Sequence, residues 1–435
     1  MKKYEIYKDS GIEWIGEIPE HWSLNKVKHN FSFKTGFTPP SGKTEYYEGG
    51  SHIWINISDL QEKEIHDSAN KITDKAIEEF KPEIVPKGSL LYSFKLSVGR
   101  VGFNMVDCYT NEAIFSIDPN GSANLNFFYY SLPEQIIKNA NENIYGAKIL
   151  NQELIKNAFL VVPTPEEQTA IANYLDRKTA EIDELIADKK RLLELYEEEK
   201  TAIINQAVTK GINPNVPMKD SGIEWLGEIP EHWEVKMLKY VANSYPSNVD
   251  KKSKEGEKEV LLCNYVDVYK NDFITSEIQF MKATASDSQV EKFKLKKGDV
   301  IATKDSESPE DIAIAALVRE DFENVICGYH LNFIRPIHIF GDFLFRFFQS
   351  KYTKGYFFNA ANGVTRYGIG TEKFSNFVIC VPPFVEQQSI VHHIETECTR
   401  IDTKKSNTKK LIDLLTEYRT ALISEVVTGK IKVTK

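Results

Sequence analysis

Three short motifs hold residue types that could support catalysis or metal binding, and each has a better structural explanation. Residues 381–384, VPPF, end like the N/D-P-P-Y/F motif of adenine methyltransferases, but Val381 stands where Asn or Asp must bond the target amine. Residues 198–200 contain the E-x-K of nuclease sites within a charged stretch that predicts a solvated helix face. His392 and His393 are adjacent, so on a helix they cannot face one metal ion. With neither GxxxxGK[ST] nor GxGxxG present, we expect no catalytic residues, no metal and no bound cofactor.

Seven loops indicate a different chemistry, because they mix Lys or Arg with hydroxyl and aromatic side chains. Arg and Lys suit phosphates and guanine edges, Asn and Gln suit adenine, and Ser or Thr suit either base. The loops therefore predict contacts to double-stranded DNA. The predicted DNA-binding residues are Lys34, Thr35, Thr38, Ser41, Lys43, Tyr46, Lys95, Ser97, Arg100, Tyr145, Lys148, Ser244, Tyr245, Ser247, Lys251, Lys252, Lys304, Ser306, Tyr329, His330, Thr365, Arg366 and Tyr367.

The net charge of the 435-residue chain is −9, which by itself is unusual for a nucleic-acid-binding protein. The deficit is concentrated in residues 1–22 and 163–233, whereas residues 23–162 and 234–381 are close to neutral. A neutral domain can still carry a basic face, so the charge does not exclude DNA binding.

The elements that must position these loops are organised by an internal repeat. DSGIEWIGEIPEHW (9–22) returns as DSGIEWLGEIPEHW (220–233) with one letter changed. Residues 162–212 likewise match residues 381–431 without a gap. The chain therefore consists of one unit that occurs twice. Each unit contains the nearly constant 14-residue segment, named the repeated phrase, followed by a variable stretch and a helix. We expect Trp14, Trp22, Trp225 and Trp233 to anchor the phrase against its domain or nearby helix ends.

Heptad spacing predicts that the two helices form a coiled coil. In the second copy, the a and d positions hold Ile390, Ile394, Ile401, Leu411, Leu415, Tyr418 and Leu422. In the first copy they hold Ile171, Leu175, Ile182, Leu185, Leu192, Tyr196, Glu199 and Ile203, with Lys178, Lys189 and Glu199 interrupting the seam. Prolines precede each helix, and Gly211 and Gly429 lie where each should end. Two amphipathic helices lying independently on their own domains are the alternative.

The variable stretches predict α+β domains with a mostly antiparallel sheet, because short β-rich runs alternate with turn residues. KPEIVPKGSLL (81–91) and EKFKLKKGDVI (291–301) occupy equivalent places, so the two domains are predicted to share one fold. The expected order is a first domain (1–162), a central helix (163–212), a linker (213–219), a second domain (220–381) and a C-terminal helix (382–435). If the helices run antiparallel, a pseudo-twofold axis relates the two domains at opposite ends of a rod.

The cysteine pattern and the apolar runs indicate a cytoplasmic protein. Five single cysteines without CxxC or Cys/His pairing argue against disulfides and zinc, and predict reduced thiols. No run of about 18 apolar residues exists, so we expect no membrane span.

With these features in place, the chain resembles the specificity subunit of a type I restriction-modification enzyme. The resemblance is carried by both copies of the phrase, by GFTPP…YYEGG…IWINISDL (36–60), by the two KG[SD][LV][LI] segments, and by VPTPEEQTAIANYLD with VPPFVEQQSIVHHIE. Their order, repeated twice, spans nearly the whole chain.

The resemblance implies a non-catalytic subunit in which two target-recognition domains each read one half of an interrupted DNA sequence. The helices would set the unread gap. Two methyltransferase subunits using S-adenosylmethionine and motor-nuclease subunits using ATP and Mg²⁺ would be the partners. Two alternatives remain at this point: the specificity half of a single-chain restriction-modification enzyme, and a coiled-coil protein adaptor without DNA specificity.

Overall fold

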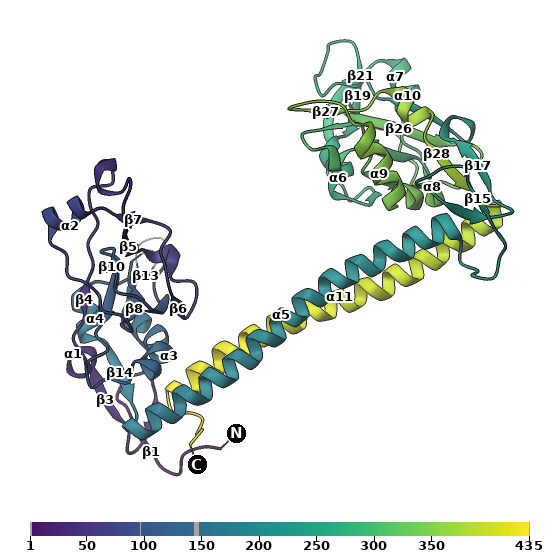
Figure 1. Ribbon diagram of the computed structural model, residues 1–435. Helices are drawn as coiled ribbons and strands as arrows, with labels where there is room; N and C mark the ends of the chain where they lie inside the picture. The colour runs from purple at the N-terminus through teal and green to yellow at the C-terminus, as the bar shows by residue number, and fades with distance from the viewer. Residues whose placement is uncertain (1, 96, 143–147, 435) are drawn as a thin grey trace. The chain divides into compact units, whose positions relative to one another are not determined.

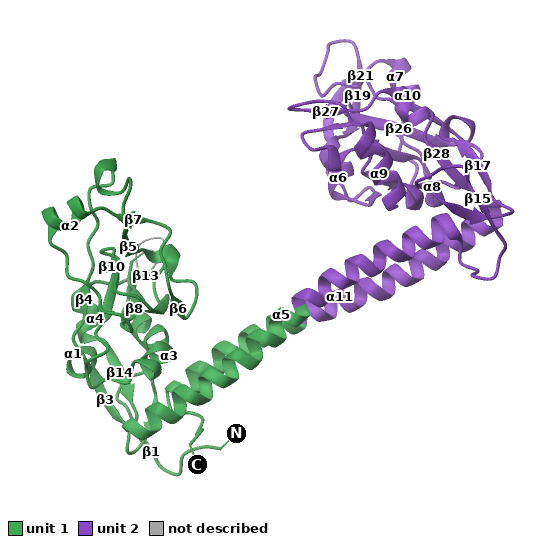
Figure 2. Ribbon diagram, viewed as in Figure 1, with its two compact units in different colours: residues 1–189, 411–435 green, residues 190–410 purple. Residues whose placement is uncertain are grey.

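The computed structural model describes residues 2–95, 97–142 and 148–434, and it divides into two compact units. Unit 1 comprises residues 1–189 and 411–435, and unit 2 comprises residues 190–410 (Figure 2). Each unit contains a small α+β domain and segments of two long helices, α5 (Pro165–Lys210) and α11 (Phe384–Val427) (Figure 1).

Both domains are built on a five-stranded sheet with the same topology. In unit 1 the order is β4 (Lys34–Thr35), β11 (Ile114–Ile117), β8 (Leu90–Ser93), β9 (Val101–Asn104) and β6 (Glu64–Ile65). In unit 2 it is β18 (Ala242–Pro246), β26 (Leu331–Pro336), β22 (Val300–Thr303), β24 (Ala315–Val318) and β20 (Phe273–Ile274). In each sheet only the last pair is parallel. The predicted α+β fold with a mostly antiparallel sheet is confirmed.

A second, three-stranded sheet repeats in the same way. Its central strand is β5 (His52–Ile55) in unit 1 and β19 (Lys258–Cys263) in unit 2. Each central strand pairs antiparallel with one neighbour and parallel with the other. These neighbours are β7 (Lys71–Ile72) and β10 (Tyr109–Thr110) in unit 1, and β21 (Met281–Ala285) and β25 (Val325–Cys327) in unit 2.

The segments that frame each domain also correspond. In unit 1, β1 (Tyr7–Asp9) pairs with β2 (Glu17–Pro19), and β3 (Ser23–Lys26) pairs with β14 (Phe159–Val162). In unit 2, the counterparts are β15 (Met218–Asp220) with β16 (Glu228–Pro230) and β17 (Glu234–Met237) with β28 (Val378–Val381). The shorter helices are α1 (Val27–Asn30), α2 (Asp74–Phe80), α3 (Leu125–Ile136) and α4 (Gln152–Asn157) in unit 1, and α6 (Tyr265–Lys270), α7 (Asp287–Phe293), α8 (Gly341–Phe348), α9 (Lys351–Ala360) and α10 (Thr371–Ser375) in unit 2.

The long helices complete the hydrophobic core of each domain. In unit 1, Ile171 and Leu175 of α5 join Leu422 and Val426 of α11 in the core that contains Trp22. In unit 2, the opposite ends of the same helices contribute Ile204, Val208, Ile390 and Ile394 to the core that contains Trp233. Each domain therefore buries the beginning of one long helix together with the end of the other.

Polar contacts join the two helices beyond these cores. In unit 2, Lys200 Nζ lies 3.0 Å from Asp402 Oδ2 and Arg400 Nη2 lies 2.7 Å from Glu199 Oε1, while Lys405 pairs with Glu197. Glu197 pairs with Lys405, whereas Glu199 and Lys200, further along α5, pair with residues 400 and 402, which come earlier in α11. The predicted antiparallel pairing is therefore confirmed there. In unit 1, Arg419 Nη2 donates to Asp183 Oδ2 at 3.0 Å.

The predicted apolar seam is only partly correct. Ile390, Ile394 and Ile401 are buried, but Leu411 is 39% exposed and Tyr418 is 46% exposed. Glu199, which interrupts the heptad pattern, is the partner of Arg400. Near their middle the helices therefore rely on ion pairs, which individually contribute little to stability but favour one register.

The repeated phrase docks on both long helices through a buried tryptophan. The indole N–H of Trp22 donates to Glu167 Oε2 at 3.0 Å, and that of Trp233 donates to Glu386 Oε1 at 3.1 Å. Each glutamate lies in the first helical turn, where a negative charge is favoured by the helix dipole.

The same phrase touches the end of the other helix. Gly429 has φ +79°, and a Cβ there would lie 2.4 Å from Pro19 Cδ and 2.9 Å from Trp22. Gly211 has φ +77°, and a Cβ there would lie 3.3 Å from Trp233. Both glycines therefore allow a left-handed helix end and a close approach of the phrase.

The four tryptophans of the phrase do not share one role. Trp22 and Trp233 are fully buried anchors, and Trp14 packs partly buried against the core of unit 1. Trp225, in contrast, is 72% exposed, so the prediction that it anchors the phrase is wrong. It lies within the turn 224–226, and its side chain faces solvent.

All five cysteines are buried free thiols. Burial raises the pKa of the Cys108 and Cys380 thiols to about 12, so both are neutral near pH 7. No described helix combines the length and apolar character needed to cross a lipid bilayer. Among the described ranges, no group of three or more His, Cys, Asp or Glu residues is placed to hold a metal ion.

Replacing Trp233 with Phe should destabilise unit 2 by roughly 1–3 kcal/mol, because it removes a buried donor to a charged acceptor and shortens a core side chain. The matched control is Trp225→Phe, which makes the same change at an exposed position and should stay within about 0.5 kcal/mol. Thermal and urea unfolding of both variants would measure the difference. Equal losses in the two variants would contradict the docking role of Trp233.

Candidate nucleic-acid interface

Three of the predicted contact loops in unit 2 converge at one end of its large sheet. β23 (Asp305–Ser306) follows strand β22 and pairs antiparallel with β27 (Tyr367–Gly368). The turn at 327–330 joins them, because Lys304 N–H donates to the His330 carbonyl at 3.0 Å. The sheet topology thus brings together Lys304, Tyr329, His330, Arg366 and Tyr367, which lie up to 63 residues apart in the sequence.

Asp305 is the centre of this cluster. Its carboxylate lies 2.7 Å from Lys304 Nζ, 2.5 Å from His330 Nδ1 and 2.8 Å from Arg366 Nη2. Burial alone would raise the pKa of Asp305, but Lys304, His330 and Arg366 outweigh it, so the pKa lies below its ordinary value. The carboxylate stays ionised and fixes the positions of three side chains that can donate hydrogen bonds.

The backbone around the cluster is tightly turned. His330 adopts φ +74°, an uncommon conformation for a residue other than glycine. Gly328 approaches the neighbouring strand so closely that a Cβ would lie 2.8 Å from the Cys263 carbonyl oxygen. Lys304 Nζ also lies 4.7 Å from the centre of the Tyr329 ring, and Tyr329 is 48% exposed. The turn therefore presents an aromatic face beside the basic groups.

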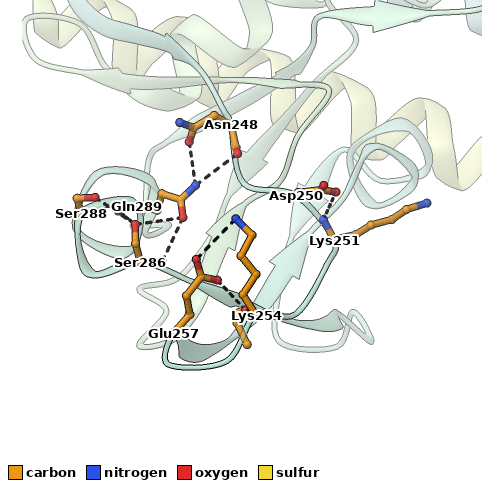
Figure 3. Close-up of polar contacts among 9 residues, drawn as sticks. Asn248, Asp250, Lys251, Lys254, Glu257, Ser286, Ser288 and Gln289 are labelled. Atoms are coloured by element: carbon orange, nitrogen blue, oxygen red, sulfur yellow. Dashed lines mark hydrogen bonds and ion pairs between the residues drawn. The ribbon is translucent and has the colours of Figure 1, made fainter.

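A lysine-rich loop, which contains Lys251, Lys252 and Lys254, lies beside the cluster and is held by polar contacts at its base (Figure 3). Lys254 N–H donates to Thr284 Oγ1 at 2.8 Å, and Thr284 Oγ1 donates to Glu257 Oε2 at 2.7 Å. Asp250 Oδ1 accepts from the backbone of Lys251 at 2.7 Å, while the Lys251 side chain points away from Lys254 and Glu257 (Figure 3). Lys251 and Lys252 are exposed and make no ion pair with any other described residue.

Close by, an open cavity of about 460 Å³ lies between this loop and the cluster. Its lining includes Lys251, Tyr265, Tyr329 and His330. The loop, the cavity and the cluster thus lie next to one another on unit 2, and apolar side chains such as Leu262 and Met281 also line the cavity.

Two of the candidates in unit 2 are buried and support the loops from inside. Ser247 is 2% exposed, and its hydroxyl donates to the Cys327 carbonyl at 2.6 Å. Ser306 is 8% exposed, and its hydroxyl lies 3.0 Å from that of Tyr265. Direct DNA contacts predicted for these two side chains do not fit their burial. Among the other candidates, Ser244 accepts a hydrogen bond from Asn332 at 2.8 Å, Tyr245 lies under Lys292, and Thr365 is exposed.

The candidates of unit 1 are more dispersed and are often matched by acidic neighbours. Lys34 pairs with Glu83, and the Thr38 hydroxyl donates to Glu112. Thr35 Oγ1 accepts from Gln152 Nε2 at 3.0 Å. Exposed positions on the same domain are Ser41, Lys43, Lys95, Ser97, Arg100 and Lys148.

Two candidates of unit 1 need separate mention. Tyr46 is 1% exposed and its hydroxyl donates to Glu79 at 2.8 Å, so its burial does not fit a direct DNA contact. Lys43 lies over its ring, with Nζ 5.4 Å from the ring centre. Tyr145 lies outside the described residues.

Asp305 is the residue that sequence reasoning missed. Selecting side chains for attraction to phosphate favours Lys, Arg and hydroxyls, and so passes over a carboxylate within the same loop. The signal in the sequence that could have indicated Asp305 is its position between Lys304 and Ser306, which are both predicted DNA-binding residues. A partly buried carboxylate that orients cations becomes visible only when β23 and β27 are paired.

A scan of protein-family models matches residues 19–195 and 230–413 to the "Type I restriction modification DNA specificity domain". The two matches begin within or close to the copies of the repeated phrase and end within the long helices. Together they cover most of the chain, one in each half.

Curated relatives are similar over nearly the whole length. The type I restriction enzyme MjaIX specificity subunit of Methanocaldococcus jannaschii is 25% identical, with 96% of this chain and 95% of the relative covered. The EcoBI specificity subunit of Escherichia coli is 22% identical, with 80% and 76% covered.

Among solved structures, a chain described under "Structural basis underlying complex assembly and conformational transition of the type I R-M system" has a TM-score of 0.67 at 12% identity, covering 95% of this chain and 99% of that one. The HsdS subunit from Thermoanaerobacter tengcongensis has a TM-score of 0.55 at 13% identity, covering 95% and 98%. At these identities the likeness shows a shared fold.

Replacing Asp305 with Asn should destabilise unit 2 at pH 7 by roughly 1–3 kcal/mol, because three donors lose a charged acceptor. The pKa of Asp305 is lower in the folded than in the unfolded chain, where it is about 3.9. The stabilisation by Asp305 is therefore present above pH ~4 and disappears as the pH falls through the pKa that Asp305 has in the folded chain. The difference in unfolding free energy between wild type and variant, measured by urea unfolding, should become smaller below pH ~4.

The control for this measurement is Glu307→Gln, which removes an exposed carboxylate two residues away. It should change stability by less than about 0.5 kcal/mol. A similar loss in the control, or a gap that is constant with pH, would contradict the central role of Asp305.

Proposed function

The chain belongs to the family of the type I restriction modification DNA specificity domain, and we propose that it is the DNA sequence-recognition subunit of a type I restriction-modification complex. The observation that carries the proposal is the duplicated frame, meaning the two sheets of the same strand order together with the repeated phrase and the long helices. This frame presents a different set of exposed loops in each unit. A binding protein for two unlike half-sites needs this combination of constant support and variable contact surface.

Each unit reads one half of an interrupted DNA target in this proposal. The surface formed by the cluster, the cavity and the lysine-rich loop is the contact region of unit 2. Lys251 and Lys252 suit phosphates, whereas side chains held rigidly at the sheet end suit base edges. In unit 1 the corresponding region involves the loops that carry Lys43, Lys95 and Arg100.

The subunit itself is non-catalytic and binds no cofactor in this proposal. Two methyltransferase subunits carry S-adenosylmethionine, and motor-nuclease subunits carry ATP and Mg²⁺. The long helices offer exposed apolar side chains for such partners, including Leu195, Leu414 and Tyr418.

The helices also set the length of DNA left unread between the two half-sites. α5 contains 46 residues and α11 contains 44, which at about 1.5 Å per residue corresponds to roughly 65–70 Å. Two helical turns of B-DNA span a similar length, at about 34 Å per turn.

Mapping N6-methyladenine across the host genome, with and without this gene, tests the proposed function directly. A bipartite motif that disappears with the gene is the expected result. Gel shifts with the purified complex at stated salt give the second readout, because non-specific affinity depends steeply on salt. A lack of sequence preference at every salt concentration would favour a protein adaptor, and methylation by the purified chain alone would favour a single-chain enzyme.

Inserting four residues after Asp188 in α5 and four after Lys410 in α11 should widen the unread gap by about two base pairs. The insertion lengthens each helix by about 6 Å, and B-DNA rises about 3.4 Å per base pair. The methylation motif should keep both half-sites. The matched control replaces four residues at the same places without changing helix length and should leave the gap unchanged. Altered half-sites with a constant gap would refute the spacing role.

A further inference from the structure

Arg366 lies at the tip of a closed hairpin in unit 2. Asn362 and Gly368 exchange backbone hydrogen bonds of 3.1 and 3.0 Å at the base of this tip. Gly363 allows the turn, because a Cβ there would lie 2.0 Å from the Arg366 carbonyl oxygen. Val364 at the tip is 91% exposed, and the Arg366 side chain is 56% exposed. The arginine therefore stands on a rigid support that projects into solvent.

Asp305 and His330 both lie within hydrogen-bonding distance of the Arg366 guanidinium. His330 Nδ1 lies 2.5 Å from Asp305 Oδ1 and 3.0 Å from Arg366 Nη2. A carboxylate only accepts and a guanidinium only donates, so the ring nitrogen serves one of them. The shorter contact assigns Nδ1–H to Asp305. Arg366 Nη2 then donates to Asp305 at 2.8 Å and, over a longer distance of 3.3 Å, to His330 Nε2.

The hydrogens of Nη1 and Nε have no acceptor among the described residues. A guanidinium presents its donors in a planar fork, which matches the O6 and N7 acceptors of guanine in the major groove once Nη2 gives up its longer contact to His330. Because Asp305 already holds the side chain, less conformational entropy is lost when a base is bound.

The cluster is not required by the fold. Phe94 N–H donates to the Ala113 carbonyl in unit 1, as Lys304 N–H donates to the His330 carbonyl in unit 2. The same sheet position thus holds Phe94 and Ala113 in one domain and Lys304 and His330 in the other. Since both domains have the same strand order, the polar cluster is an addition to the frame.

We propose that Arg366 determines specificity by reading a guanine in the half-site bound by unit 2, with Asp305 and His330 as positioning residues. This inference rests on the proposed function and adds to it a residue and a base.

The test compares methylation motifs in hosts whose complex contains wild-type chain, Arg366→Gln or Arg366→Lys. Both variants should relax or change one guanine position in one half-site and leave the other half-site unchanged. Arg366→Lys keeps the charge but cannot form the planar fork, so it should lose discrimination as well. The purified complex should lose about 5- to 150-fold in affinity for the cognate site, the range of one bidentate base contact.

Lys251→Ala provides the contrasting variant. As a phosphate contact it should weaken binding to all sequences, reduce the salt dependence by about one charge, and leave the motif unchanged. Asp305→Asn should resemble Arg366→Gln in the motif, because it releases the arginine. Melting temperatures of all variants, measured alongside, identify effects of unfolding.

Two results would overturn the inference. One is an unchanged motif in both Arg366 variants, and the other is a uniform loss of affinity like that of Lys251→Ala, which would make Arg366 a phosphate contact. In both cases a bipartite wild-type motif leaves the proposed function intact. A wild-type complex with no bipartite motif would instead refute the proposed function itself.

Discussion

The hydrogen bond from a buried indole N–H to a glutamate in the first turn of a long helix is the constraint on which both units depend. Trp22 binds Glu167 and Trp233 binds Glu386, at nearly equal distances. A histidine preceding each tryptophan contacts the same glutamate, at 3.0 Å for His21 and 2.7 Å for His232. Because the acceptor is charged and the donor is buried, loss of either partner is costly.

This docking explains why the repeated phrase varies so little between the two copies. The phrase must contact the beginning of one helix and the glycine that ends the other, so its buried residues have fixed neighbours. Gly429 and Gly211 leave no room for a side chain beside Pro19 and Trp233, respectively, without some local shift. The one tryptophan pair outside this contact, Trp14 and Trp225, differs in burial between the copies.

A frame fixed in this way leaves the loops at the sheet end free to differ. Unit 2 uses its loops to build a carboxylate-centred cluster with Lys304, His330 and Arg366, whereas unit 1 pairs single residues such as Lys34 with local carboxylates. Acidic residues therefore orient cations on these surfaces. The negative net charge of the chain is compatible with such local basic surfaces.

The sequence by itself determined the repeat, the two long helices and the α+β class, because nearly identical phrases, heptad spacing and alternating β-rich runs can be recognised without knowing which residues are neighbours in space. α5 and α11 lie within the ranges expected from prolines and glycines at their ends. It also selected Lys304, His330 and Arg366 as members of contact loops. Tertiary structure alone decided that these three meet at Asp305, since their contact depends on the pairing of strands far apart in the chain. It likewise decided that Tyr46, Ser247 and Ser306 are buried and that Trp225 is exposed. Burial depends on which neighbours pack against a side chain, and residue type and spacing do not specify those neighbours.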